Sequence, residues 1–189
     1  MRLVVISAGL STPSSTRLLA DRLAAATEAG DLRVVELREL AHDIADTMLT
    51  GFAPAKLQSA LDAVAGADAL IAVTPIFTGS YSGLFKSFFD VVDKDALVDK
   101  PVLIAATGGT ARHSLALEHA LRPMFAYLRA VVVPTAVYAA SEDWADDGTL
   151  RQRIDRAAAE LVREAGRRDP VTVADPFALT TSFEDLLSR

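Results

Sequence analysis

The chain has 189 residues, of which 51% are hydrophobic and none is cysteine, and its formal net charge is −6. This length predicts one domain with a sizeable core, and the lack of cysteine excludes disulfide scaffolds, cysteine-ligated zinc or iron–sulfur sites and thiol nucleophiles. The acidic balance argues against nucleic acid as a partner. The sequence shows neither a signal region nor an apolar run of roughly 18 residues, which argues against a membrane protein. We therefore expect a cytoplasmic protein.

Five aliphatic runs predict buried β-strands, in chain order over residues 3–6, 32–37, 69–74, 102–107 and 130–139. Helical spacing of apolar residues predicts helices over residues 15–27, 54–65, 82–92, 112–128 and 150–168. Residues 38–53 have a mixed pattern, with a short helical turn. We expect Pro75 to stop the third strand and Pro123 to bend the helix around it. Strands that alternate with helices predict an α/β fold with a doubly wound, five-stranded parallel sheet.

The predicted elements fill residues 1–168, and no repeat, low-complexity block or charge run divides them. We therefore expect a single domain over residues 1–168. Residues 169–189 carry two prolines and isolated aromatic residues. We expect this C-terminal extension to be an extended arm or a flexible tail.

Hydroxyl side chains cluster after the first predicted strand, with six Ser or Thr residues among positions 7–16. A helix is predicted to begin inside this stretch, and the free N–H groups of a helix N-terminus favour an anion. The loop lacks both G-x-G-x-x-G and G-x-x-x-x-G-K-[ST], which excludes the common dinucleotide and triphosphate loops. The pattern favours a phosphate site, although helix capping alone would account for Ser14 or Ser15.

The third and fourth predicted strands also end in unusual loops. Residues 74–83 contain two glycines, with Phe77 and Tyr81 placed to contact a flat ring, although this composition is also that of an ordinary turn. Residues 107–113 contain Gly108 and Gly109, whose N–H groups can meet the edge of a flavin that becomes negative on reduction. In a parallel sheet these loops meet at one edge, where ligands bind.

No nucleophile–base constellation stands out, and the three histidines lie at no metal-ligand spacing, so we predict neither a catalytic side chain nor a metal site. His113 is the best placed of the three histidines. It is expected either to contact a flavin or pyridine nucleotide or to pack and cap at a helix start. The chemistry is therefore expected to come from a bound cofactor.

Three motifs make the chain resemble the NAD(P)H-dependent FMN reductase family, which has a flavodoxin-like fold. They are Ser-x-Thr-Arg-Leu-Leu at 14–19, Thr-Pro-Ile-Phe-x-Gly-Ser-Tyr-Ser-Gly-Leu-Phe-Lys at 74–86 and Thr-Gly-Gly-Thr-x-x-His at 107–113. The resemblance covers residues 1–168. Within the family, the chain is most similar to reductases that supply luciferase-like monooxygenases.

The resemblance implies FMN and NAD(P)H as ligands and assigns three groups of contacts to FMN. The phosphate is expected at Ser11, Ser14, Ser15 and Thr16, the ring and ribityl chain at Pro75, Ile76, Phe77, Thr78, Gly79 and Ser80, and the pyrimidine edge at Thr107, Gly108, Gly109 and Thr110, with His113 nearby. Many relatives have arginine where this chain has Ser11. Arg17 is the nearest cation to compensate, or it points to solvent.

The resemblance further implies a homodimer or homotetramer, with the helix over residues 82–92 at an interface. The broad apolar stripe of that helix fits either this interface or the core of its own subunit; it comprises Leu84, Phe85, Phe88, Phe89 and Val92. The expected activity is hydride transfer from NAD(P)H to FMN, after which reduced FMN leaves for a partner monooxygenase.

Two alternatives to this activity remain open. The first is a reductase of quinones, azo dyes or metal oxyanions that keeps its FMN bound. The second is an electron carrier like flavodoxin or a flavin-binding regulatory module, which the ring loops favour less because residues 75–81 and 107–113 contain no Asp or Glu. The sequence does not choose between NADH and NADPH.

Overall fold

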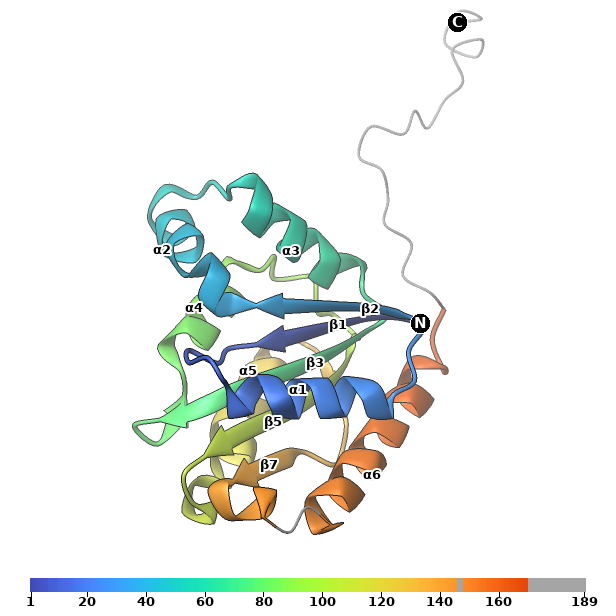
Figure 1. Cartoon of the computed structure of the whole chain (residues 1–189). Coiled ribbons are helices and arrows are strands. Elements are labelled where there is room, and N and C mark those ends of the chain that lie inside the picture. Colours follow the sequence, from blue (N-terminus) through green and yellow to red (C-terminus); the bar gives the residue numbers. More distant parts are fainter. Residues whose placement is uncertain (146–147, 170–189) are drawn as a thin grey trace, which may run out of the picture.

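The computed structural model describes residues 1–145 and 148–169 and contains a central, mostly parallel sheet (Figure 1). Its parallel strands are β1 (Arg2–Ser7), β2 (Asp31–Glu36), β3 (Ala69–Phe77), β5 (Pro101–Gly108), β6 (Val131–Val132) and β7 (Val137–Ala140). The order across the sheet is β2-β1-β3-β5, and both β6 and β7 pair with β5. This is the 2-1-3-4-5 order of flavodoxin-like doubly wound folds, which confirms the predicted fold class.

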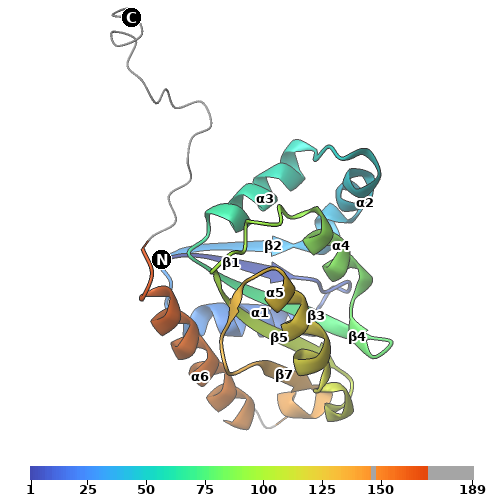
Figure 2. The ribbon, with the colours of Figure 1, turned by 180° about the vertical axis from the view of Figure 1, so that it is seen from behind.

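Helices cover both faces of the sheet because its central strands are apolar on both sides. On one face lie α1 (Ser15–Ala26) and α6 (Gly148–Ala165), which pack on a core that includes Val5 and Leu103 (Figure 1). On the other face lie α2 (Ala41–Thr50), α3 (Ala55–Gly66), α4 (Gly83–Val91) and α5 (Arg122–Tyr127) (Figure 2). Alternate residues of β1, β3, β5 and β7 thus contribute to two separate cores.

The apolar stripe of α4 belongs to the core of its own chain. Phe85, Phe88, Phe89 and Val92 are each at most 7% exposed. The ring of Phe89 lies 4.9 Å from that of Phe85 and 5.0 Å from that of Phe125 on α5, in edge-to-face arrangements. Of the two interpretations left open by the sequence, the core of its own subunit holds for these four residues, while the oligomeric state is a separate question.

The third strand continues past Pro75, contrary to the prediction that proline stops it. β1 ends opposite Val73, so the following residues of β3 have a free edge on that side, where a missing N–H is tolerated. On the other side Pro75 is in register with Thr107 of β5. The strand then turns back into β4 (Ser80–Tyr81), forming a hairpin.

Two further segments differ from the predicted elements. Residues 37–50 form a 3₁₀ turn, η1 (Leu37–Leu40), followed by α2, because Leu37, Leu40 and Ile44 are buried at helical spacing. The predicted helix over 112–128 is divided into the 3₁₀ turn η2 (Ala111–His113), the π-helical turn η3 (Leu117–Leu121) and α5. Pro123 lies in the first turn of α5. Because proline has no backbone N–H, Pro123 donates no hydrogen bond to the turn before it.

The fifth strand position is also divided. The predicted strand over 130–139 is two short strands, β6 and β7, on either side of Pro134. A 3₁₀ turn, η4 (Ser141–Trp144), follows β7. The expected C-terminal arm or tail lies outside the described residues beyond residue 169. In the described part of the chain, no helix is long and apolar enough to cross a membrane.

Candidate functional site

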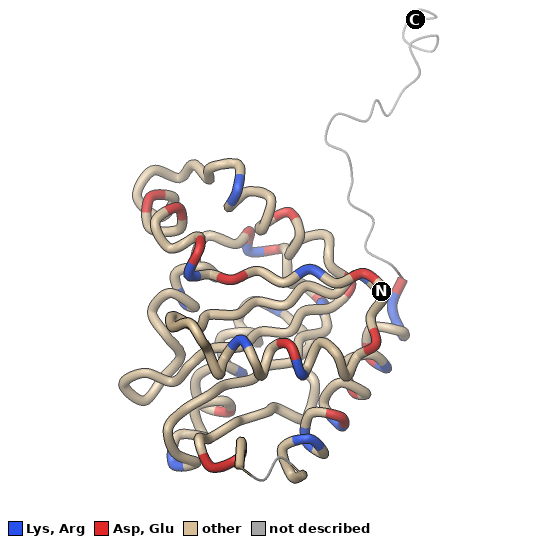
Figure 3. Tube along the Cα trace, in the orientation of Figure 1, with Lys and Arg blue, Asp and Glu red and all other residues tan. Residues whose placement is uncertain are grey.

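A cleft of about 530 Å³ lies at the carboxyl ends of β1, β3, β5 and β7. This edge includes the point between β1 and β3 where the strand order reverses, which is where ligands bind in doubly wound sheets. The cleft is lined by Leu10, Ser11, Ser14, Ser15, Thr16, Pro75, Ile76, Phe77, Thr107, Gly108, Gly109, Ser141 and Trp144. Among these described lining residues none is charged, and the β3–β4 hairpin beside them carries no charge either (Figure 3).

The loop after β1 presents hydroxyls at the N-terminus of α1. Ser14 is the N-cap of this twelve-residue helix, and its hydroxyl accepts a hydrogen bond of 3.2 Å from the N–H of Arg17. A Cβ at Gly9 would stand 2.0 Å from Ser14 Oγ, so a larger residue there would displace this hydroxyl from its capping position. Ser15 is exposed at the first position of α1. The loop therefore offers hydroxyl and N–H donors to an anion.

A buried polar floor lies beneath this loop. The hydroxyls of Thr16 and Thr107 are 2.8 Å apart, and these residues are 2% and 3% exposed. This hydrogen bond ties the start of α1 to the end of β5. Ser7, at the end of β1, is 1% exposed, and its hydroxyl is the buried side-chain atom for which the described part of the chain offers no hydrogen-bond partner. The floor thus has one polar group, the Ser7 hydroxyl, that the described part of the fold does not pair.

The hairpin after β3 forms an apolar wall of the cleft. Its turn residues Thr78 and Gly79 have φ of 50° and 81°, the left-handed region that two-residue hairpin turns require. Thr74 anchors its base by accepting a hydrogen bond of 3.0 Å from the N–H of Ser82, just before α4. Phe77 is 47% exposed, so its ring is available to a flat ligand.

The loop after β5 is fixed from β7. The Tyr138 hydroxyl donates a hydrogen bond of 2.9 Å to the carbonyl of Thr110. Burial, with a smaller contribution from the Asp143 carboxylate, raises the pKa of the Tyr138 phenol, which keeps it in its donating form. A Cβ at Gly108 would lie 2.0 Å from this hydroxyl oxygen, so glycine is needed for the contact.

Ten of the sixteen predicted site residues line the cleft, and six do not. Thr78, Gly79 and Ser80 lie at or beside the hairpin turn, while Thr110 and the exposed His113 lie in the loop beyond Gly109. Arg17 is engaged elsewhere, with Asp21 at 2.7 Å and with Glu36 of β2. Its hydrogen bond to Asp21, with the charges of both carboxylates, raises the pKa of Arg17.

Three lining residues were missed from the sequence: Leu10, Ser141 and Trp144. Leu10 lies within the predicted hydroxyl loop. Ser141 and Trp144 follow β7, and a signal for them existed, because the carboxyl end of the fifth strand must reach the same edge as the other three.

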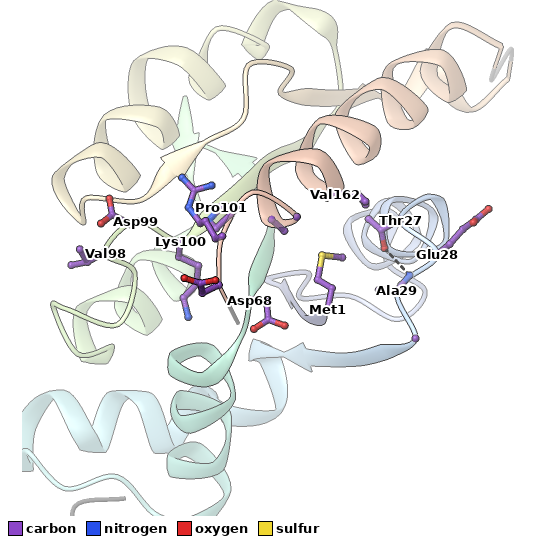
Figure 4. A pocket seen from close by; sticks show the side chains of 15 residues that line it. Met1, Thr27, Glu28, Ala29, Asp68, Val98, Asp99, Lys100, Pro101 and Val162 are labelled. Carbon is purple, nitrogen blue, oxygen red and sulfur yellow. Dashed lines mark hydrogen bonds between the residues drawn. The ribbon is translucent and has the colours of Figure 1, made fainter. Parts of the chain in front are cut away.

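A second cavity, of about 550 Å³, lies at the opposite edge of the sheet and contains none of the predicted site residues (Figure 4). It is lined by both ends of the described chain, including Met1 and Asp169, and by Lys100. The Lys100 amine lies within 2.6–2.8 Å of three backbone carbonyls. Its polar side chain is thus used by the fold, and the cleft at the carboxyl edge is the better candidate for chemistry.

Comparison with known proteins assigns this chain to a family. The family model for NADPH-dependent FMN reductases matches residues 1–145. The chain belongs to the NADPH-dependent FMN reductase family. The matched residues include all four strand ends of the cleft.

Individual relatives agree with this family membership. An FMN reductase (NADPH) of Pseudomonas aeruginosa is 44% identical over 76% of this chain and 78% of its own length. The NADH-dependent FMN reductase SfnF of Pseudomonas fluorescens is 40% identical over 85% of this chain and 89% of its own length. Among solved structures, an oxidoreductase from Corynebacterium diphtheriae is 47% identical, with a TM-score of 0.85 over 89% of this chain and 99% of its own.

Proposed function

We propose that this FMN reductase family member transfers a hydride from NADH or NADPH to FMN, and that reduced FMN then leaves for a separate monooxygenase. One observation carries the proposal of release. The cleft offers hydroxyls, a helix N-terminus and glycine backbone, while its described lining contains no charged side chain. Such a site neutralises a phosphate only partly, which suits a flavin that binds, reacts and dissociates.

The cradle after β1 is the proposed phosphate site. Ser14, Ser15 and Ser11 offer hydroxyls at the N-terminus of α1, whose dipole and free N–H groups favour an anion. The Gly9 position keeps the Ser14 hydroxyl free of steric conflict. The orphan hydroxyl of Ser7 adds a polar group to the floor below the cradle. These residues fit the phosphate of FMN.

The ring of FMN is proposed to lie between the two loops at the ends of β3 and β5. FMN bound there would supply N5 as the hydride acceptor, and its N1–C2 carbonyl edge would need donors for the negative charge that reduction brings. The hairpin residues Pro75, Ile76 and Phe77 offer an apolar surface that orients the ring and excludes water from one side. Gly108 and Gly109 bring backbone close to the pyrimidine edge, held in place by Tyr138 through Thr110. No acid–base side chain is needed for this step.

The first test is steady-state oxidation of NADH and NADPH by the purified chain. We expect turnover that depends on added FMN and saturates with it, because the flavin acts as a substrate. The loss of reduced nicotinamide absorbance measures the rate, and the two nucleotides are compared directly, since the relatives' names divide between NADPH and NADH. An absence of FMN-dependent turnover would contradict the proposed activity. FMN that survives gel filtration and passes its electrons to a quinone would instead identify a reductase with a resident flavin.

We also propose that the chain forms a homodimer or homotetramer through a groove between α4 and α5. The groove has a volume of about 510 Å³ and is lined mainly by apolar and aromatic residues, among them Phe89, Met124 and Leu128. Tyr127, which also lines the groove, is 87% exposed, which is unusual for a tyrosine that serves only its own chain. A second copy of this chain is the proposed occupant.

Replacement of Tyr127 by lysine is expected to weaken this self-association by roughly tenfold or more, as for a central aromatic residue of an interface. Sedimentation velocity over a concentration series measures the effect. Leu32→Lys is the matched control, because Leu32 is 45% exposed on the edge strand β2, outside the groove. A wild-type monomer, or equal shifts for both variants, would count against the groove.

A further inference from the structure

The cleft has a fourth wall, formed by η4 at the carboxyl end of β7. Ser141 and Trp144 of this turn line the cleft together with the loops after β1, β3 and β5. β7 runs parallel to β5 with Ala140 in register with Gly108, so η4 begins directly beside the Gly108–Gly109 loop. A ligand that fills the cleft must therefore pass close to this turn.

The indole of Trp144 is held on one of its faces. The guanidinium carbon of Arg22, from α1, lies 5.1 Å from the centre of the indole ring, within cation–π range. Trp144 also packs against the core beneath α1 and α6, and it remains partly exposed. Since Arg22 covers one face, a ligand in the cleft can meet the indole only through its opposite face or its edge.

The backbone that carries Trp144 is anchored as well. The carboxylate of Asp143 accepts hydrogen bonds from the N–H of Ala140 at 2.7 Å and from Arg153 of α6 at 2.6 Å. Arg153 in turn donates to the carbonyl of Tyr138 at 2.7 Å. The wall is thus fixed to both β7 and α6 before any ligand arrives, which is what a binding surface needs.

We propose that Trp144 is a flavin-contacting residue, with Arg22 as the residue that positions its indole. This inference rests on the proposed function, since FMN is taken as the occupant of the cleft. It adds a large, rigid aromatic surface to a site whose predicted contacts were hydroxyls, glycines and the hairpin. This surface would add contact area in a cleft whose described lining has no charged side chain.

The first experiment uses the fact that the chain contains a single tryptophan. Protein labelled with 5-fluorotryptophan gives one ¹⁹F resonance for the native fold, and this resonance reports on Trp144 alone. We expect it to shift when FMN is added and to stay in place when NADP⁺ is added without flavin. A chemical shift that does not change at saturating FMN would overturn the inference. A shift with NADP⁺ alone would also overturn it, because the wall would then belong to the nicotinamide nucleotide.

The second experiment measures the dissociation constant of FMN for variants. We expect Trp144→Leu to raise it about tenfold, as for the loss of one aromatic stacking surface, and Trp144→Phe to raise it less. Arg22→Met is expected to raise it a few-fold and to reduce the FMN-induced ¹⁹F shift, since the indole is no longer held in place. Arg33→Met, which alters an exposed arginine of β2 bonded to Ser59, is the control and should leave both readouts unchanged.

Thermal unfolding without FMN shows whether each variant is folded, so that a weaker FMN affinity can be assigned to the changed contact and not to unfolding. Affinity unchanged within twofold in a folded Trp144→Leu variant would refute the inference while the proposed function stands. A folded wild-type chain that binds no FMN at all would instead refute the proposed function.

Discussion

Replacement of Ser15 by aspartate is expected to weaken FMN binding roughly 100-fold while leaving the fold at least as stable as before. Ser15 is exposed at the start of α1 and lines the proposed phosphate cradle. A carboxylate there stands close to the phosphate, and repulsion of about 2–3 kcal/mol at the effective dielectric of a protein surface corresponds to a loss of this size. The same carboxylate interacts favourably with the helix dipole when no flavin is bound, since α1 has no acidic residue in its first turn.

This variant is a specific test of the phosphate position, because its FMN affinity is expected to fall while the stability of the flavin-free chain does not. FMN affinity is measured by titration of flavin fluorescence, and stability by thermal unfolding of the flavin-free chain. Ser15→Asn is the matched control, because it has nearly the same shape as aspartate and no charge, and we expect it to lose less than about fivefold in affinity. Equal affinities for the aspartate and asparagine variants would place the phosphate away from the N-terminus of α1.

The sheet and most of the cleft could be predicted because their signals are local. Buried parallel strands are continuous aliphatic runs, as residues 69–74 and 102–107 are, and these runs are easily found. Because the carboxyl ends of parallel strands meet at one edge of the sheet, the three loops could be placed together without knowing any tertiary contact. Thr16 and Thr107, which are 91 positions apart, do meet at that edge.

The errors concern features that depend on tertiary contacts. The position of Arg17 follows from its pairing with Glu36, which requires β2 to lie beside β1, and a sequence pattern does not give that neighbour. The choice between the two interpretations of the α4 stripe likewise depends on a tertiary contact, because Phe125 of α5 packs on Phe89. The wall at Trp144 was missed because the fifth strand was predicted as one uninterrupted run and its loop has no glycine or hydroxyl cluster.

Lys100 is a further residue that the sequence does not single out. Between Asp99 and Pro101 it has the pattern of a solvated loop lysine, yet it is 4% exposed. Its amine donates to the carbonyls of Val64, Ala65 and Ala67 at 2.6, 2.8 and 2.8 Å. These carbonyls belong to the C-terminal end of α3, whose dipole favours a cation. One side chain therefore caps a helix from a loop more than thirty positions away.

Replacement of Lys100 by methionine is expected to lower the free energy of unfolding by about 2–3 kcal/mol at neutral pH. Methionine keeps the apolar stem of the side chain but leaves the three carbonyls without their donor in a buried setting. Chemical denaturation of the flavin-free chain measures the change. Lys94→Met is the control, because Lys94 is exposed, and we expect its effect to stay within about 0.5 kcal/mol. Similar stabilities for the two variants would mean that solvent serves the end of α3 equally well.

The pH dependence of this difference follows from the ionisation of Lys100. Burial lowers the pKa of Lys100 from 10.5 to about 8, with Asp68 opposing the shift and Arg2 adding to it. Between these two values the unfolded chain binds a proton that the folded chain lacks, so the contribution of Lys100 to the unfolding free energy rises with pH. Below pH 8 the amine is charged in both states, and the cost of burying its charge is fully present. The stability difference between the wild type and Lys100→Met is therefore expected to widen from pH 8 towards 10.5, and a difference that narrows over this interval would contradict the lowered pKa.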